Sequence, residues 1–145
     1  MLLRDLSKIV RGGQIFLTRS LAEFELNSAE EIVLMYIFGN PETNQDAIAE
    51  FFMLDKGTVA RTLARLEEKG FINRRVNNAN QREKIITTTE KANSVKDVCT
   101  GLLKAWDDIL YTGISREDAA NFERMAGCMA ENITKKLKQE LVYGK

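Results

Sequence analysis

Two short helical segments joined by a very short link, followed by an abrupt change of hydrophobic period, constrain the fold of this chain most strongly. Asn44 and Asp55 are residue types favoured at helix N-caps, and they precede predicted helices over 45–52 and 56–69. Only two residues separate the first helix from the second cap. Apolar residues recur at intervals of three and four in the second helix, which ends at a Lys-Gly pair typical of helix C-termini.

After Gly70 the pattern becomes that of strands. Residues 71–76 are rich in apolar and β-branched residues, 77–81 are rich in asparagine, and 83–88 contain two isoleucines and two threonines. This order predicts a β-hairpin with a polar tip. Two tightly joined helices followed by a hairpin are typical of a winged helix-turn-helix. The agreement of caps, turns and periods favours this fold over a helical domain with an incidental hairpin.

The segment before this unit is predicted to be helical as well. A first helix is expected over about 2–24, weakened and bent at Gly12 and Gly13 because glycine disfavours helix interiors. The run from Ser28 to Glu31 has the sequence of a capping box, which predicts a helix over about 29–38.

Two longer helices follow the hairpin, over about 90–110 with Thr89 as its cap and over about 116–142 after Ser115. Their apolar stripes are Val95, Val98, Cys99, Leu102, Leu103, Trp106, Ile109 and Leu110 in the first, and Phe122, Met125, Met129, Ile133, Leu137 and Leu141 in the second. The predicted fold class is therefore mainly α with a small β-hairpin, a winged helix-turn-helix flanked by terminal helices.

Composition excludes several kinds of site. Histidine is absent and there are two cysteines, which excludes His-based catalysis, His-ligated zinc and a four-cysteine metal site. No acidic pair accompanies a phosphate loop or a nucleophile, so we expect no enzyme, catalytic residue, metal or cofactor. No apolar run reaches the roughly 18 residues that span a bilayer, and the N-terminus does not resemble a signal peptide. We therefore expect a cytoplasmic protein without a membrane partner.

The charge is balanced in total but not in placement. There are 21 basic and 21 acidic residues, and zero net charge by itself argues against a nucleic-acid partner. Residues 1–52 hold 4 basic and 8 acidic residues, 53–84 hold 8 and 4, and 85–145 hold 9 of each. The basic excess falls on the second short helix and the hairpin, the elements of a winged helix that meet DNA.

The residue types on these elements predict their contacts with DNA, although charged runs also coat ordinary solvated faces. Arginine can hydrogen-bond guanine and can enter a narrow minor groove. The residues expected to reach bases or grooves are Thr58, Arg61, Thr62, Arg65 and Arg82. The first turn of the helix and the other basic residues of the hairpin are expected at phosphates. These are Lys56, Gly57, Arg74, Arg75 and Lys84.

Residues 44–92 resemble the MarR family of transcription regulators. The resemblance rests on the run DKGTVARTLARLEEKGFI from Asp55, the Arg-Arg pair that follows it, and the TEKA sequence that opens the next helix. The Asp-x-Arg motif of the family's wing is here Asn80-Gln81-Arg82. This departure keeps the arginine but removes the ionic part of a contact between the two side chains.

The resemblance implies a homodimer on a pseudo-palindromic operator in double-stranded DNA, with recognition helices about 34 Å apart. It implies a dimerisation helix in 1–28 and a DNA-binding region in 29–89, which contains a recognition helix over about 55–69 and a wing over about 71–88. It also implies that 90–145 form a connecting helix and a second dimerisation helix. The apolar stripes at both ends of the chain agree with a dimer, because they exceed what the winged unit could cover alone.

The resemblance also implies a ligand-responsive repressor that a small organic effector releases from DNA. Four aromatic residues are candidates to line its pocket, although aromatic residues at helical spacing more often belong to a core: Phe16, Tyr36, Trp106 and Tyr111. Cys99 is expected to be a buried thiol, and Cys128 is the candidate for oxidation. The alternative function is a winged-helix protein-interaction module without direct DNA readout, which would lack the steep salt dependence of DNA binding.

Overall fold

The computed structural model describes the backbone of residues 1–143 and the side chains of residues 1–140. It divides within one long helix into two compact units, Met1–Trp106 and the residues from Asp107 onwards. The first unit therefore combines the N-terminal helix, the predicted winged part and most of the connecting helix. No helix among the described residues is both long and apolar enough to cross a membrane.

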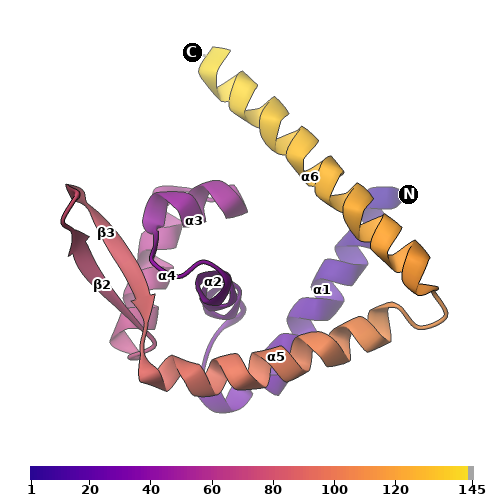
Figure 1. Cartoon of the computed structure of the whole chain (residues 1–145), viewed down its shortest axis with the longest axis horizontal. Coiled ribbons are helices and arrows are strands. Elements are labelled where there is room, and N and C mark those ends of the chain that lie inside the picture. Colours follow the sequence, from indigo (N-terminus) through magenta and orange to yellow (C-terminus); the bar gives the residue numbers. More distant parts are fainter. Residues whose placement is uncertain (144–145) are drawn as a thin grey trace. The chain divides into compact units, whose positions relative to one another are not determined.

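The secondary structure confirms the predicted fold class, with mostly helices and one small antiparallel sheet (Figure 1). The elements in chain order are α1 Leu2–Ser20, the 3₁₀ turn η1 Ala22–Phe24, α2 Ser28–Gly39, β1 Thr43–Asn44, α3 Gln45–Phe52, α4 Lys56–Glu68, β2 Ile72–Asn77, β3 Asn80–Thr88, α5 Glu90–Leu110 and α6 Arg116–Tyr143. The order of helix, tight link, helix and hairpin is the one predicted.

Local hydrogen bonds explain the tight link between α3 and α4. The Asn44 side chain accepts a hydrogen bond from the Ala47 amide at 2.8 Å, and Asp55 accepts one from the Thr58 amide at 2.8 Å, so both predicted N-caps are confirmed. Met53 turns the chain in the left-handed conformation, with φ of +52°. Gly70, with φ of +80°, ends the second helix as predicted, because glycine adopts this backbone conformation without steric cost.

The wing has one strand more than predicted. Strands β2 and β3 form the expected antiparallel hairpin, with Ile72 opposite Thr88. The two-residue strand β1 adds to the other edge of β3, with Thr43 opposite Ile86, so the strand order is β1-β3-β2. Two residues are too few to show an alternating pattern, which is why β1 had no signal in the sequence. The consequence is a direct connection between the wing and the start of α3.

One apolar core holds the first unit together. It includes one side of α4, the inner faces of α2 and α3, the sheet and the first half of α5. Its buried members are Leu21, Leu26, Val33, Leu34, Ile37, Ile48, Ala49, Val59, Leu63, Leu66, Phe71, Ile72, Ile86, Ala92, Val95 and Cys99. The segment that follows the wing is tied to the end of α4, since the Thr89 hydroxyl donates to the Gly70 carbonyl at 2.6 Å. Thr89 was predicted to cap α5 and instead makes this tertiary bond.

The glycine pair in α1 has a packing role. The helix continues through both residues and ends at Ser20, four residues before the predicted end. A Cβ atom at Gly12 would lie 3.3 Å from the Trp106 ring, and one at Gly13 would lie 3.4 Å from it. The two glycines therefore let the indole approach the α1 backbone, and Phe16 completes the contact with its ring centroid 5.7 Å from that of Trp106.

The capping box at the start of α2 lies one residue earlier than predicted. Asn27, and not Ser28, is the N-cap, and its side chain accepts from the Glu30 amide at 2.9 Å while Glu30 accepts from the Asn27 amide at 3.1 Å. Asparagine caps as well as serine, so the sequence offered two overlapping boxes. Glu30 also pairs with Lys69 at 2.7 Å, which ties the end of α4 to the start of α2.

Glu31, the residue after the capping-box glutamate, lies in the core. Its side chain is 1% exposed, and only one of its oxygens has a partner, the Thr18 hydroxyl, which donates at 3.2 Å. The other oxygen, Oε1, is buried without a hydrogen bond. Burial raises the pKa of the Glu31 carboxyl, the Thr18 hydrogen bond partly opposes this rise, and the neighbouring Glu30 carboxylate adds to it.

We expect Glu31→Gln to stabilise the protein at pH 7 by about 1 kcal/mol, because it removes a buried charge and keeps an acceptor for Thr18. The raised pKa means that the folded state binds the Glu31 proton more tightly than the unfolded state. The Glu31 carboxyl therefore destabilises the folded protein least at pH values below its pKa in the unfolded state. The folded protein loses stability as the pH rises through the pKa that Glu31 has in the folded state. The advantage of the variant over the wild type should shrink in acid.

Urea unfolding at several pH values measures this effect. Glu30→Gln is the matched control, because Glu30 is equally buried but paired with Lys69, and its loss should destabilise the protein at pH 7. A Glu31→Gln protein that is less stable than the wild type at pH 7 would contradict the expectation.

Candidate nucleic-acid interface

The apolar side of α4 determines which of its residues face outward. Val59, Leu63 and Leu66 are fully buried, and Arg61 and Arg65 are exposed on the other side of the helix. No hydrogen bond or ion pair occupies the Arg65 guanidinium within the described residues. The exposed face of α4 therefore carries one arginine that is free to bind a ligand and a second that has only a local contact.

That local contact belongs to a small cluster at the start of α4. The Asp55 carboxylate accepts from the Thr58 amide and from the Thr58 hydroxyl, the latter at 2.6 Å, and Arg61 donates to the same hydroxyl at 3.1 Å. The hydroxyl hydrogen bond is the main reason that the pKa of Asp55 lies below its ordinary value. Gly57 leaves room for the cluster, since a Cβ atom there would lie 3.2 Å from Asp55 Oδ1 and 3.4 Å from an Arg61 nitrogen.

Thr62 does not share the exposed face, so the prediction that it lies there is wrong. Its side chain is 8% exposed, and its hydroxyl donates to the Thr58 carbonyl at 3.0 Å. A residue three positions after Val59 still lies within the buried arc of a helix. The hydroxyl is thus hydrogen-bonded to a carbonyl on the preceding turn of its own helix, as is common for threonine in helices.

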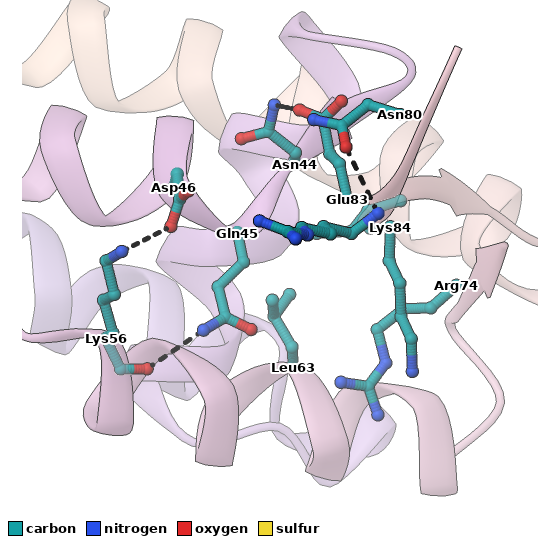
Figure 2. Close-up of a pocket in the computed structure, with 11 residues that line it drawn as sticks. Asn44, Gln45, Asp46, Lys56, Leu63, Arg74, Asn80, Glu83 and Lys84 are labelled. Atoms are coloured by element: carbon teal, nitrogen blue, oxygen red, sulfur yellow. Dashed lines mark hydrogen bonds and ion pairs between the residues drawn. The ribbon is translucent and has the colours of Figure 1, made fainter. Parts of the chain in front are cut away.

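The wing and the helices α3 and α4 line an open cavity of about 530 Å³ (Figure 2). It is lined by Asn44, Gln45, Asp46, Lys56, Leu63, Arg74, Asn80, Arg82, Glu83, Lys84 and Ile86. Four of these residues are basic and two are acidic. The structure therefore brings the predicted wing arginine, Arg82, to the same hollow as the first turn of α4.

At the tip of the wing, Asn80 contacts Arg82 in an unexpected way. The Asn80 side chain accepts from the Arg82 backbone amide at 3.2 Å. The Arg82 guanidinium has no hydrogen bond or ion pair within the described part of the chain. The bond between Asn80 and Arg82 thus shapes the turn and leaves the arginine side chain free.

Three of the basic residues predicted at phosphates are paired with acidic residues. Lys56 lies 3.4 Å from Asp46, and Arg75 lies 2.5 Å from Glu42, both on the exposed surface. Arg74 is different, because it is partly buried and donates twice to one Glu67 oxygen, at 3.0 and 2.5 Å. The hydrogen bonds from Arg74 lower the pKa of Glu67. Arg74 therefore braces β2 against α4.

The wing is also held by a contact that has no sequence signal. Glu83 on β3 accepts hydrogen bonds from the side chains of Asn44 and Asn77. Asn44 is 39 residues away in the chain, and polar pairs at such a separation leave no periodic pattern.

The four aromatic residues considered for an effector pocket have different partners. Phe16 stacks on Trp106, as described above. Tyr36 instead packs on Phe51 and Phe52, with ring centroids 4.7 and 5.6 Å away. Tyr111 belongs to the second unit, where its hydroxyl donates to Glu123 at 2.8 Å and where this bond raises its pKa.

The two cysteines differ in burial, as predicted. Cys99 is buried, and burial together with the nearby Glu31 carboxylate raises its thiol pKa, which favours the inert protonated form. Cys128 is exposed. Among the described residues, no group of cysteine and acidic side chains is arranged to hold a metal ion.

Comparison with known proteins identifies relatives over nearly the whole chain. The MarR family model matches residues 26–84. An Uncharacterized HTH-type transcriptional regulator, YybA of Bacillus subtilis (strain 168), is 24% identical over 132 residues, which cover 91% of this chain and 88% of the relative.

Solved structures extend this similarity. A crystal structure of MarR is 32% identical, with a TM-score of 0.82 and coverage of 96% of this chain and 95% of the other. A putative MarR family transcriptional regulator from Listeria monocytogenes, complexed with 26mer DNA, shares the fold with a TM-score of 0.87 at 22% identity, covering 92% of this chain and 89% of the other.

We expect Arg74→Ala to destabilise the first unit by about 0.5–1 kcal/mol, a value reduced for the partial exposure of Glu67. Arg65→Ala should change stability by less than about 0.5 kcal/mol, because nothing in the folded chain is lost. The lowered Glu67 pKa means that the contribution of the pair is present above the unfolded carboxyl pKa and is lost as pH falls through the folded one. Urea unfolding at pH 7 and pH 3 measures both effects. Equal losses for the two variants would refute the assignment of Arg74 as a brace.

Proposed function

Because this chain belongs to the MarR family of transcription regulators, we propose that it is a dimeric repressor that binds a pseudo-palindromic operator and releases it when a small organic effector binds. As a member of this family it is a transcription regulator and not an enzyme. The proposal places the protein in the cytoplasm, where such DNA is accessible.

The observation that carries the proposal is which basic residues form ion pairs or hydrogen bonds within the chain and which do not. Within the described chain, the guanidinium groups of Arg65 and Arg82 are unpaired and exposed, one on the outer face of α4 and one on the wing. An exposed helix face with a free arginine suits the major groove, where arginine binds guanine. An arginine on a projecting hairpin suits the minor groove. Unpaired arginine donors on both an exposed helix face and a projecting hairpin are typical of a surface that binds an anion.

The roles of the other residues follow from their contacts. Arg61 and Thr58 lie beside Arg65 on α4 and complete the base-reading or groove-reading set, from which Thr62 is omitted because it is buried. Residues for phosphate contacts are the exposed ones on the first turn of α4 and on the wing, namely Lys56, Gly57, Arg75 and Lys84. Surface ion pairs such as those of Lys56 and Arg75 contribute little stability, so phosphates can replace their partners at small cost.

Exposed apolar residues support the proposed dimer. On α6, Phe122, Met125, Met129, Ile133 and Leu137 are between 37% and 49% exposed. They recur at intervals of three and four and so follow one side of the helix. Leu141, predicted to extend this stripe, lies outside the described side chains. Exposed apolar residues also occur on α1, including Leu2, Leu3 and Val10. The proposed dimer buries these surfaces, with 1–28 and 90–145 as its dimerisation regions and 29–89 as its DNA-binding region.

The proposed release of DNA requires an effector that binds the two states of the dimer with different affinity. The stacked pair of Phe16 and Trp106 joins α1 to α5, the two elements that would connect the dimer to the winged part. Trp106 is the single tryptophan of the chain. A change in its fluorescence that accompanies loss of DNA binding, on addition of an aromatic acid, would identify such an effector. Compounds that release DNA without changing this fluorescence would place the effector site elsewhere.

We expect Arg65→Ala and Arg82→Ala each to weaken binding to an operator duplex, selected from random DNA with the wild-type protein, by about tenfold or more, and to reduce discrimination against unrelated DNA. Lys84→Ala should weaken binding to all duplexes and reduce the slope of log affinity against log salt by about 1. Fluorescence anisotropy at several salt concentrations measures these quantities.

The control for the DNA experiment is Lys104→Ala, which removes an exposed charge from α5. It should leave operator affinity within about twofold of the wild-type value, since surface charges outside the interface act only through the screened field. Unchanged operator affinity in Arg61→Ala, Arg65→Ala and Arg82→Ala would remove the reading face from the proposal. Binding that does not depend on salt would favour a protein-interaction module.

We expect Ile133→Lys to convert the dimer to a monomer at micromolar concentration, because it places a charge in a buried apolar interface. Glu131→Lys is the control, since Glu131 lies on the charged side of α6, where it pairs with Lys135 at 3.7 Å. Sedimentation velocity distinguishes the two states. A monomeric wild-type protein, or a dimer that tolerates Ile133→Lys, would contradict the assigned interface.

A further inference from the structure

We infer that Glu83 is a positioning residue, which holds the wing against α3 and thereby sets the place of Arg82. The inference rests on the proposed function in one respect, that Arg82 contacts DNA. It concerns a carboxylate that lies in the middle of the basic surface. An acidic group there repels phosphates, so its presence calls for a structural reason.

Glu83 is the centre of a chain of hydrogen bonds between three elements. Its Oε1 accepts from the Asn44 side chain, and its Oε2 accepts from the Asn77 side chain at 2.6 Å. The other end of the Asn44 amide accepts from the Ala47 backbone amide at 2.8 Å, which is the N-cap of α3. Figure 2 shows Asn44 and Glu83 facing each other across the edge of the cavity. A single carboxylate thus joins the start of α3 to both strands of the wing.

The position of Asn77 extends this restraint to the tip of the wing. Asn77 is paired with Asn80 where the hairpin closes, next to an irregularity in the strand register. Its side-chain oxygen also accepts from the Ala79 amide at 3.0 Å within the turn. Arg82 lies between this turn and Glu83, so the chain is restrained on both sides of the arginine.

The restraint has a particular use in this sequence. The wing has Asn80 where the family motif has aspartate, and the Asn80 side chain makes only a neutral bond of 3.2 Å to a backbone amide. Hydrogen bonds to a charged acceptor are about twice as strong as neutral ones. In the described part of the wing, Glu83 is the carboxylate nearest in sequence to Arg82 and accepts two such bonds. We therefore assign to Glu83 the role of orienting Arg82, which an aspartate at position 80 would otherwise support.

A swap of donor and acceptor tests this assignment. Glu83→Gln removes the charge and leaves one acceptor for the two donors, Asn44 and Asn77, so one of the two bonds to position 83 is lost. Asn44→Asp replaces the donor to Glu83 by a second carboxylate and breaks the bond between positions 44 and 83. In Asn44→Asp/Glu83→Gln the glutamine donates to the aspartate and accepts from Asn77. Aspartate remains a good N-cap for α3. The net charge, side-chain size and number of hydrogen bonds then equal those of the wild type.

Two quantities should follow the bond. The ratio of affinities for a selected operator duplex and an unrelated duplex of equal length should fall about tenfold in each single variant and return to within about twofold in the swap. Hydrogen exchange of the Asn80 to Arg82 amides, measured without DNA, should accelerate in each single variant and recover in the swap. Glu83→Gln should at the same time bind unrelated DNA more tightly, because a repulsive charge is lost.

The matched control is Glu68→Gln, which removes an exposed carboxylate at the end of α4. It should leave the wing exchange rates unchanged. If the swap behaves no better than the single variants, or if Glu83→Gln raises both affinities equally without changing exchange, Glu83 has no positioning role. A wild-type protein that prefers no DNA sequence would instead refute the proposed function, and the exchange rates would still decide whether Glu83 restrains the wing.

Discussion

The burial of one side of α4 is the constraint on which the rest of this structure depends. Val59, Leu63 and Leu66 pack into the core, and this contact fixes the rotation of the helix about its axis. Because the rotation is fixed, Arg61 and Arg65 face outward and Thr62 does not. The ion pair between half-exposed Lys69 and buried Glu30 then secures the end of the helix to α2. Apolar packing on the opposite side of α4 therefore determines which of its residues are available to contact bases.

Ion pairs within the chain divide the basic residues into two kinds. Arg74 is engaged by Glu67 and braces the wing, whereas the guanidinium of Arg65 is left without a partner among the described residues. A zero net charge is compatible with DNA binding under this division, because affinity depends on which cations are free at the interface and not on the total. Two acidic residues in the same region have a structural role, since Glu67 and Glu83 each hold a wing residue in place.

Local signals in the sequence predicted the local structure well. The caps at Asn44 and Asp55 and the glycine at 70 are confirmed because each depends on residues within one helical turn. The start of α2 was misplaced by one residue because Asn27 and Ser28 are equally good caps by residue type. Strand β1 was missed because its partner lies in β3, more than forty residues later.

The sequence by itself determined the order of elements, the winged helix-turn-helix and the concentration of basic residues on α4 and the hairpin, since periodicity, caps and charge placement are local properties of the chain. Only the tertiary structure decided which of those residues are available. Three contacts join different elements of the fold through space. They are the ion pair of Arg74 with Glu67, the hydrogen bonds from Asn44 and Asn77 to Glu83, and the approach of Trp106 to the two glycines of α1. Such contacts depend on distances that exist only after the core has packed, so no pattern along the chain records them.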